Sequence, residues 1–456
     1  MKRFFTLFVV AFLSWLFLSA DGQNQKPSDE QIFTMALTGD SIITRKLSVY
    51  TEPEFLQMIE LVRRVDVAFT NLEVLFHDYE PFPMHQSGGT YMRADPALAK
   101  ELVWAGFDMV SRANNHTGDY GIQGMRLTTK YVDEAGLLDA GVGDSLSEAR
   151  EAKFLDTAKA RVALISCAST FPDHVRAGKS RGDIPPRPGL SPLRYSTTYE
   201  VTKEQMGALR QLLESLGMRL PKKDDALRAF ERRFIKGKTP AILTEVNKED
   251  LEEISAVVRN ASRLADYTIV TIHAHESDKD RFVPAKFLIA FARVMIDAGA
   301  DVFVGHGPHV LRGIEIYKGK PIFYSLGNFV FQNETLDRLP YENYEPYRLD
   351  SNSHVADFND KRYNLDRRGF PSRQEYWESV IAVPAWNGKE IVEIKLYPVS
   401  LGFGKPRIVR GRPLFAKEDL SKKIIEDLAR LSKPFGTTVE YQDGIGIVKL
   451  STKEGK

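Results

Sequence analysis

Potential metal ligands follow five short apolar runs of this sequence, each at the point where the run ends. They are carboxylate, amide and imidazole side chains: Asp40, Asn71 with Glu73, Asn115 with His116, His273, and His306 with His309. Such donors bind Zn, Mn, Fe or Mg, and two carboxylates with several imidazoles can hold a pair of divalent ions that clamp a phosphate and activate water. Because four of the nine histidines belong to this set, the sequence predicts one convergent metal site.

The segment 114–119 adds a group suited to proton transfer. Within Asn-Asn-His, Asn115 offers an amide oxygen as a ligand, and His116 offers an imidazole that can act as a general acid. Asp119 lies three residues further on, where its carboxylate can fix the orientation of that imidazole. We therefore expect His116 and Asp119 to act together in catalysis.

The other histidines carry a weaker signal. Four of them lie outside the strand-end set and are interpreted as ordinary polar residues: His77, His85, His174 and His354. His275 shares a strand face with His273 if that strand continues so far. Both a ligand role and a non-ligand role stay open for His275.

Alternating strands and helices must position these side chains. Short apolar runs predict strands at 32–38, 65–76, 107–113, 161–167, 267–272, 301–304 and 321–324, and helical spacing predicts helices at 53–64, 96–105, 124–134, 250–265 and 284–298. Repeated units of this kind form a mainly parallel sheet covered by helices, in which ligands gather at the carboxyl ends of the strands. The expected fold class is therefore α/β.

Two stretches interrupt this alternation within a main domain expected at 30–400. Residues 171–244 are rich in Pro, Arg and Lys, with helices expected near 203–216 and 224–236, and residues 332–375 are polar and lack periodicity. We interpret both as insertions on the scaffold, and the second as either a lid over the site or a surface loop. Residues 378–401 alternate like antiparallel strands, and a helix at 421–430 is expected within a C-terminal extension, 401–456.

The N-terminus has the form of a secretory signal. Lys2 and Arg3 precede an apolar run at 4–18, after which small residues allow cleavage following Ala20 or Gly22. An uncleaved membrane anchor is the alternative, but the run is shorter than the ~20 residues that span a bilayer comfortably. We expect residues 1–22 to be a signal peptide and the protein to be exported to the periplasm or cell surface.

Composition excludes some classes of function. The chain of 456 residues has 62 Lys and Arg against 61 Asp and Glu, and this balance argues against a nucleic-acid partner. A single cysteine, Cys167, excludes an intramolecular disulfide and a cysteine-based zinc or iron–sulfur site. The site must therefore be built from imidazole, carboxylate and backbone groups.

Five segments together resemble the capsule-synthesis CapA family. They are LTGDSIITR (37–45), FTNLE (69–73), AGFDMVSRANNHTGDYG (105–121), TIVTIHAHE (268–276) and GADVFVGHGPHVLRGIEIYKGKPIFYSLGNFVF (299–331). The family includes PgsA-type components of poly-γ-glutamate production and is related in fold to the calcineurin-like metallophosphoesterases. The resemblance implies a metallophosphoesterase-like layered αββα sandwich with insertions.

The resemblance also implies roles for individual residues. Asp40 would be the first metal ligand, Glu73 would take the place of the bridging carboxylate, and His116 would be the acid that faces the substrate. The remaining metal ligands would be Asn115, His273, His306 and His309. Arg45 would bind an anion of the substrate, whereas no role is implied for Asn328 in the SLGNF turn.

Three positions depart from the pattern that the resemblance implies. Metallophosphoesterases carry a histidine two residues after the first aspartate, where this chain has Ile42. Gly307 replaces the family's second consecutive histidine, and Ala274-His275-Glu276 stands where a Trp-Gly pair and then a glutamate are usual. These differences lie on the ligand-bearing loops, so metal choice and phosphoesterase activity do not follow from the resemblance.

Three functions from different classes remain. The first, which we favour, is an exported CapA-like protein that serves synthesis, transfer or release of an anionic extracellular polymer such as poly-γ-glutamate, with a metal-dependent hydrolase or transferase site. The second is an extracytoplasmic metallophosphoesterase acting on nucleotides or phosphorylated glycans. The third is a non-catalytic scaffold that binds the polymer or a membrane-bound polymer synthase.

Overall fold

The computed structural model describes residues 32–221 and 226–450. The predicted signal peptide at 1–22 lies outside the described residues. Among the helices of the described ranges, none is long and apolar enough to cross a membrane.

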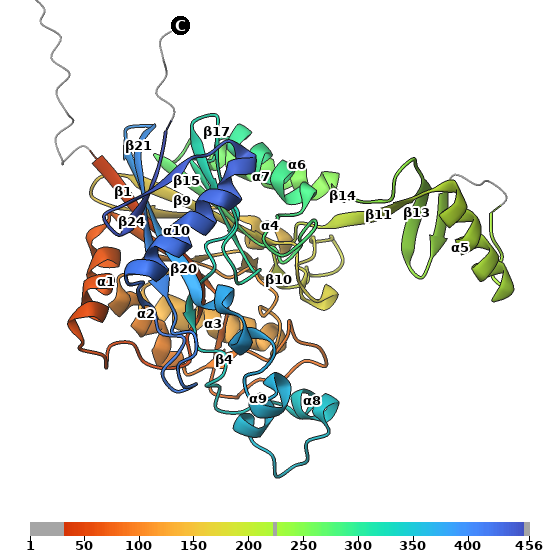
Figure 1. Ribbon diagram of the computed structural model, residues 1–456, viewed down its shortest axis with the longest axis horizontal. Helices are drawn as coiled ribbons and strands as arrows, with labels where there is room; N and C mark the ends of the chain where they lie inside the picture. Colours follow the sequence, from red (N-terminus) through yellow and green to blue (C-terminus); the bar gives the residue numbers. More distant parts are fainter. Residues whose placement is uncertain (1–31, 222–225, 451–456) are drawn as a thin grey trace, which may run out of the picture.

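The first of two large β-sheets has ten strands in the order β23-β24-β21-β20-β1-β2-β5-β6, with β19 also paired to β1 and β22 to β21 (Figure 1). Its parallel part contains β1 (Ile32–Ile42), β2 (Val67–Leu72), β5 (Met109–Ser111), β6 (Leu138–Ala140) and β19 (Asn328–Phe331). Its antiparallel part contains β20 (Glu378–Asn387), β21 (Glu390–Ser400), β22 (Leu414–Phe415), β23 (Val439–Gln442) and β24 (Ile445–Val448). The expected antiparallel strands at 378–401 are thus confirmed.

The second large sheet has six strands in the order β17-β18-β16-β15-β9-β8. They are β17 (Ile314–Tyr317), β18 (Lys320–Phe323), β16 (Val302–His306), β15 (Tyr267–His273), β9 (Arg161–Ala168) and β8 (Lys153–Asp156), of which β18, β16, β15 and β9 run parallel. Two short pairs complete the body: β3 (Leu75–Phe76) with β4 (Arg93–Ala94), and β7 (Val142–Gly143) with β10 (Gly189–Leu190).

Helices cover the outer faces of both sheets. The first sheet carries α1 (Pro53–Arg64), α2 (Ala99–Ala105) and α3 (Gly121–Ala135), and the second carries α6 (Lys248–Ala261) and α7 (Lys286–Asp297). Each of these helices was expected from its apolar spacing. The chain leaves α2 at Gly106 (φ 102°), a left-handed residue that glycine adopts without a steric penalty. A short α4 (Leu146–Arg150) precedes β8.

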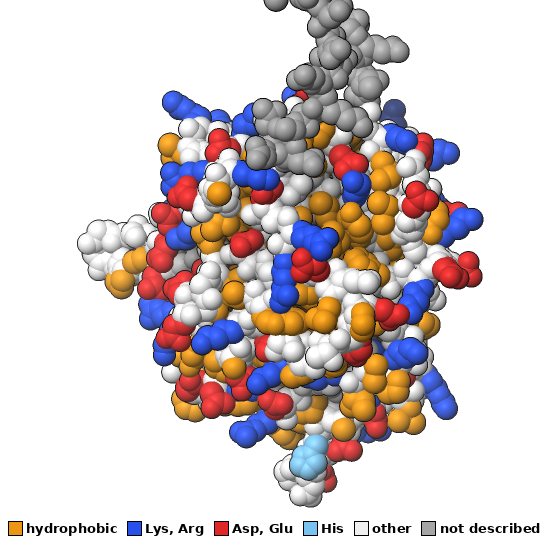
Figure 2. Space-filling model, turned by 90° about the vertical axis from the view of Figure 1, so that its left-hand side faces the viewer, with side chains coloured by type: hydrophobic (Ala, Val, Ile, Leu, Met, Phe, Trp, Pro, Cys, Tyr) orange, Lys and Arg blue, Asp and Glu red, His pale blue; other side chains and the backbone are white. Residues whose placement is uncertain are grey.

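Three apolar layers hold these elements together. In β1, Met35 and Leu37 pack between the two sheets while Ala36 faces the helices of the first sheet. In β9, Leu164 lies between the sheets and Ile165 faces α6 and α7. This period-2 alternation buries both faces of each sheet, and the predicted αββα sandwich is confirmed. Figure 2 shows one outer face, where acidic and basic side chains are interspersed.

The predicted insertion at 171–244 consists of two parts. Its first part runs over the body, where Leu190 and Leu193 are buried. From residue 195 the chain forms a small unit that projects from the body (Figure 1), which we call the projecting module: β11 (Tyr195–Val201), α5 (Lys203–Ser215), β12 (Ala226–Ala229), β13 (Arg232–Lys236) and β14 (Ala241–Val246). Its sheet has the order β12-β13-β11-β14.

The helix expected at 224–236 is wrong, whereas the one expected at 203–216 is confirmed as α5. Residues 226–236 form the hairpin of β12 and β13, in which Leu227 and Ala229 pack against α5. Phe230 (φ 49°) and Glu231 (φ 59°) make the two-residue turn. Positive φ at both turn positions matches the twist of a hairpin, and a helix would not bury Leu227 and Ala229 together.

The polar stretch at 332–375 contains two short helices, α8 (Tyr341–Tyr344) and α9 (Val355–Tyr363). Glu334 anchors its beginning, because the Glu334 carboxylate accepts hydrogen bonds from the buried Arg410 guanidinium (2.6 Å from Nε). Near its end, the ring of Phe370 lies 5.6 Å from the ring of His309. This contact agrees with a lid over the expected site, one of the two interpretations given above for residues 332–375, rather than with a surface loop.

The C-terminal extension expected from residue 401 continues the first sheet. It adds β22, β23 and β24 together with α10 (Glu418–Ser432), a longer helix than the one expected at 421–430. Ile424, Ile425 and Leu428 of α10 belong to the apolar layer between the two sheets. The extension is therefore part of the sandwich.

Candidate metal centre

The alternation of the strands brings the predicted ligands to one place between the sheets. In β2, Val67 and Phe69 face the inter-sheet layer, and the same phase continues to Asn71 and Glu73. In β15 and β16 it leads from Ile269 to His273 and from Val304 to His306, which are paired in register. Asp40 of β1 lies opposite Asn71 of β2 and Asn328 of β19. The carboxyl ends of β1, β2, β15 and β16 thus converge, as expected, and the first residue of β19 lies beside them.

Asp40 is fully buried among donors. Its carboxylate accepts hydrogen bonds from Asn71 Nδ2 (2.8 Å) and the backbone N–H of Gly307 (3.2 Å). The Nδ1 atoms of His306 and His309 lie 3.3 and 3.4 Å from its two oxygens. Burial alone would raise the pKa of Asp40, but the hydrogen bonds and charge of these two histidines hold it well below its usual range. Asp40 is therefore an anion in the folded protein.

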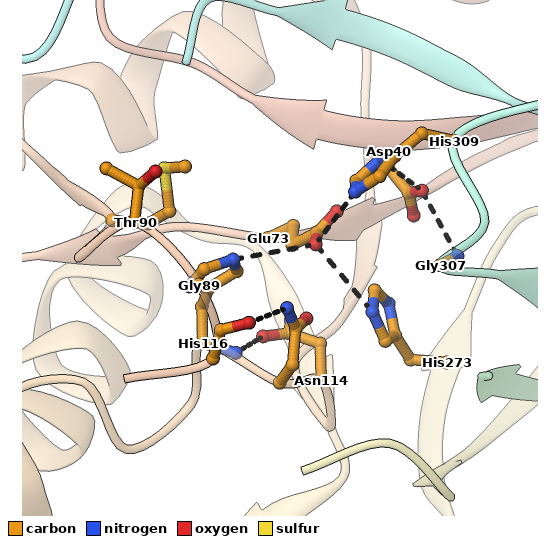
Figure 3. A network of polar contacts seen from close by, with 12 residues as sticks. Asp40, Glu73, Gly89, Thr90, Asn114, His116, His273, Gly307 and His309 are labelled. Atoms are coloured by element: carbon orange, nitrogen blue, oxygen red, sulfur yellow. Dashed lines mark hydrogen bonds and ion pairs between the residues drawn. The ribbon is translucent and has the colours of Figure 1, made fainter. Parts of the chain in front are cut away.

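Glu73 lies at the centre of the cluster (Figure 3), and its carboxylate has no hydrogen-bond donor although both oxygens are buried. Three imidazoles surround its Oε1: the Nε2 atoms of His273 and His309 lie 3.7 Å away, and that of His116 lies 3.9 Å away. Burial raises the pKa of Glu73 well above its usual range, against the effect of His309, and the Asp40 carboxylate raises it further. A buried carboxylate without a donor, ringed by imidazole nitrogens, fits the chemistry of a ligand for a divalent cation.

The structure places His275 in the cluster, where it could serve as a ligand. Strand β15 ends at His273, yet the Nε2 atoms of His273 and His275 lie only 2.9 Å apart. Burial, with a smaller effect from His309, lowers the pKa of His275 to about 3, so its imidazole is neutral. Either ring can be the donor in the hydrogen bond between the two Nε2 atoms.

Two sets of ligand atoms can each hold an ion. One is Asp40, Glu73 and His273, and the other is Glu73, His275 and His309; in each set the ligand atoms lie within 4.8 Å of one another. The sets share only Glu73, which is the position that the resemblance gives to a bridging carboxylate. The donors are oxygen and imidazole nitrogen, in keeping with Zn, Mn, Fe or Mg.

His275 also accounts for the glycine at position 307. A Cβ on Gly307 would lie 2.9 Å from Cδ2 of His275, and Gly307 has φ 109°, which disfavours other residues. A histidine at 307, which the resemblance implies, is therefore incompatible with this position of His275. In this chain the imidazole of His275 takes the place of the one that a histidine at 307 would supply. The backbone N–H of Gly307 donates a hydrogen bond to Asp40.

His309 is held by a residue whose role the sequence left open. Its Nδ1 donates to Asn328 Oδ1 (2.8 Å), and Asn328 Nδ2 donates to the backbone carbonyls of His309 (3.3 Å) and Tyr376 (3.0 Å). Burial would lower the pKa of His309, but Glu73 and Asp40 raise it to about 9. A cation that binds through His309 must displace this proton, so metal affinity rises with pH up to that range.

His116 and Asp119 adopt the arrangement expected of a proton donor and its orienting group. His116 Nδ1 donates to Asp119 Oδ2 (2.7 Å), and the same carboxylate accepts the backbone N–H groups of Gly88 (2.9 Å) and Met92 (2.8 Å). These bonds fix the imidazole with its Nε2 toward Glu73. Asn115 lies beside them with Oδ1 buried and without a donor, in keeping with its predicted role as a ligand.

The structure ties Arg45 to another part of the protein. Its guanidinium donates to the backbone carbonyls of Ile408 and of Arg410 (2.9 Å from Nη2), which belong to the C-terminal segment. These contacts give Arg45 a role in fastening that segment, so the expected anion-binding role is not supported by its geometry. His306 is placed beside Asp40 as expected but belongs to neither of the two ligand sets.

Comparison with known proteins adds the family. The model of the bacterial capsule synthesis protein PGA_cap matches residues 34–333. The uncharacterized protein y4sH of Sinorhizobium fredii is 39% identical over 430 residues, covering 92% of this chain and 93% of that protein. The capsule biosynthesis protein CapA of Bacillus anthracis is 27% identical, covering 67% of this chain and 61% of that protein, and the PGA biosynthesis protein CapA of Bacillus subtilis is 27% identical, covering 71% and 70%.

Among solved structures, a putative 5'-nucleotidase from Staphylococcus aureus is 12% identical and covers 89% of this chain and 58% of its own, with a TM-score of 0.36. The match of the family model includes all of the strand ends that form the cluster, from Asp40 to Asn328. The chain belongs to the bacterial capsule synthesis protein PGA_cap family.

Proposed function

We propose that this protein is a metal-dependent hydrolase or transferase that serves the synthesis, transfer or release of an anionic extracellular polymer such as poly-γ-glutamate. The names of its Bacillus relatives support the polymer, since one is a capsule and the other a PGA biosynthesis protein. The observation that carries the proposed site is Glu73, a buried carboxylate without a donor that faces three imidazoles.

The residues divide the chemistry between them. Asp40, Glu73, His273, His275 and His309 would hold one or two divalent ions, and such ions polarise a carbonyl or phosphoryl oxygen of a bound substrate. His116, with Nδ1–H fixed by Asp119, presents Nε2 to the same space and can give a proton to the leaving nitrogen of an amide. Burial of these side chains at the strand ends strengthens the interactions, because the local dielectric is lower than in water.

Metal content and turnover test this function together. The purified chain, loaded in turn with Mn, Zn, Fe and Mg, is expected to bind metal and to cleave or transfer γ-glutamyl chains. Asp40→Ala should lower both metal occupancy and turnover about 100-fold or more, because losing even an outer-shell partner of a metal ligand typically costs 10–100-fold. Turnover of phosphodiesters alone would instead establish the phosphoesterase alternative. Absence of metal and of turnover would leave a polymer-binding scaffold.

We also propose that the protein is exported across the cytoplasmic membrane and that a membrane-bound polymer synthase is its partner. Its support is the basic and apolar sequence at 1–18 followed by small residues. Cell fractionation with N-terminal sequencing is expected to recover protein from the periplasm or surface that begins after Ala20 or Gly22. Recovery of the intact N-terminus from the cytoplasm would contradict export.

A further inference from the structure

A polar cleft of about 880 Å³ separates the body from the projecting module. Residues 169–176 of the body form one wall, and β11, β12 and β13 of the module form the other. Five arginines line it against two acidic residues, Asp173 and Glu231: Arg176, Arg194, Arg228, Arg232 and Arg233. The chain as a whole is almost neutral, so this concentration of guanidinium groups is local.

The five arginines differ in what they contact. Arg194 is bound to the carboxylate of Asp250 (2.7 Å from Nε), and Arg176 lies near Asp173 (3.6 Å). The three arginines on the module are exposed, and no carboxylate within the described ranges forms an ion pair with any of them: Arg228, Arg232 and Arg233. The module therefore presents a net positive charge to the cleft, three arginines against Glu231.

The hairpin register places two of these charges side by side. Arg228 of β12 and Arg233 of β13 are directly opposite each other in the antiparallel pair. Their face of the sheet is the one away from α5, because Leu227 and Phe234, the neighbouring pair, pack toward that helix. Like charges directly opposite each other destabilise a sheet unless an anion lies between them. The hydroxyls of Ser196 and Thr198 on β11 supply neutral donors along the same wall.

Two residues on the body side of the cleft belong to segments that contact the metal centre. Ser169 lines the cleft, and its backbone N–H donates to the carbonyl of His273 (3.0 Å). Gln86 lines it as well, and two residues later the N–H of Gly88 donates to Asp119, which orients His116. The body side of the cleft is therefore built from segments that adjoin those carrying the ligands and the proton donor.

We propose that this cleft binds an extended polycarboxylate chain and guides it toward the metal centre, with Arg228 and Arg233, which lie side by side, as the carboxylate-binding residues. This inference rests on the proposed function and adds a second subsite to it. Guanidinium groups suit repeated carboxylates because each can donate two parallel hydrogen bonds, and neighbouring guanidinium groups along one cleft match a polymer better than a single small anion.

The test is equilibrium binding of fluorescently labelled poly-γ-glutamate to the full chain at low and high salt. The variant with Arg228→Ser and Arg233→Ser should bind at least about tenfold more weakly at low salt and lose most of the salt dependence. A matched control with Lys203→Ser and Lys238→Ser removes the same charge from exposed positions of the module outside the cleft and should bind like wild type. Arg228→Lys with Arg233→Lys should recover part of the affinity.

Further arms separate this inference from the proposed function. Asp40→Ala should retain polymer binding while losing metal, so absence of metal or turnover in the wild type leaves the cleft intact. Equal binding by the serine variant and wild type overturns the inference, and so does binding of polyphosphate of matched length without binding of poly-γ-glutamate. Binding of free glutamate as tight as that of the polymer overturns it too, because a row of charges then has no role.

Discussion

Replacing Glu73 by glutamine is expected to remove stable metal binding and turnover while leaving the protein folded. Both carboxylate oxygens lack a donor, and Glu73 belongs to both ligand sets. An amide keeps the shape but is a much weaker ligand, and it loses the charge that attracts the cation. We expect metal affinity to fall about 100-fold or more, measured by mass spectrometry of metal content and by titration.

The same substitution should change the stability of the metal-free protein in a pH-dependent way. The folded-state pKa of Glu73 is raised above its unfolded value, so the folded wild type holds more protons and loses stability as pH rises. The pKa of His309 is raised to about 9 in the folded protein. Protonated His309 therefore also stabilises the fold at low pH, and this stability is lost as the pH rises toward 9. Glu73→Gln lacks the first contribution and weakens the second, because the Glu73 charge is itself one cause of the raised pKa of His309. Its free energy of unfolding should therefore fall less between pH 5 and pH 8 in the presence of a chelator.

Glu101 offers a matched control, since its buried carboxylate is fully used. It accepts hydrogen bonds from the N–H groups of Leu47 (2.9 Å) and Ser48 (2.7 Å) and from Ser48 Oγ (2.9 Å). Glu101→Gln should lower the free energy of unfolding by about 1–3 kcal/mol without changing metal content. If both variants keep metal, or if Glu73→Gln destabilises the metal-free protein as Glu101→Gln does, Glu73 is an ordinary buried carboxylate.

The strand-end ligands could be found in the sequence because the pattern of apolar residues within a strand shows which of its side chains are buried. Alternation along β2, β15 and β16 fixes which side chains face between the sheets, and the parallel order fixes at which end they meet. Glu73, His273 and His306 follow from these two facts, whereas Asp40 comes after a register shift in β1 and His309 lies three residues past the end of β16. The pair of His116 and Asp119 follows from their spacing of three residues within one turn.

The features that the sequence could not supply depend on contacts between distant segments. Arg45 has the charge of an anion-binding residue. In the folded protein, however, its guanidinium donates hydrogen bonds to the backbone carbonyls of residues 408 and 410 in the C-terminal segment, which the sequence alone does not show. His275 lies past the end of its strand, where loop geometry rather than period decides its direction. At 226–236, the spacing of Leu227, Phe230 and Phe234 also fits a helix. The segment forms a hairpin instead because this conformation buries both Leu227 and Ala229 against α5.

Replacing His116 by asparagine is expected to separate catalysis from metal binding. His116 faces Glu73 at 3.9 Å but belongs to neither ligand set, so the loss of its imidazole should leave metal content unchanged. If it gives the proton to the leaving group, kcat should fall about 10²–10⁴-fold while KM changes little. Asp119→Asn should lower kcat by about 10–100-fold, because it disturbs the bond that orients the imidazole.

The outcome distinguishes a proton donor from a structural histidine. His354→Asn is the control, since His354 only caps α9 and asparagine is a good cap, so metal content and kcat should match wild type. For His116→Asn, the decisive readout is the limb of the pH–rate profile that reports the acid, which should disappear along with most of the turnover. A fall in metal content parallel to kcat would make His116 a ligand. An unchanged profile with a lower kcat would make it a packing residue, and the proton would then have to come from another group at the strand ends.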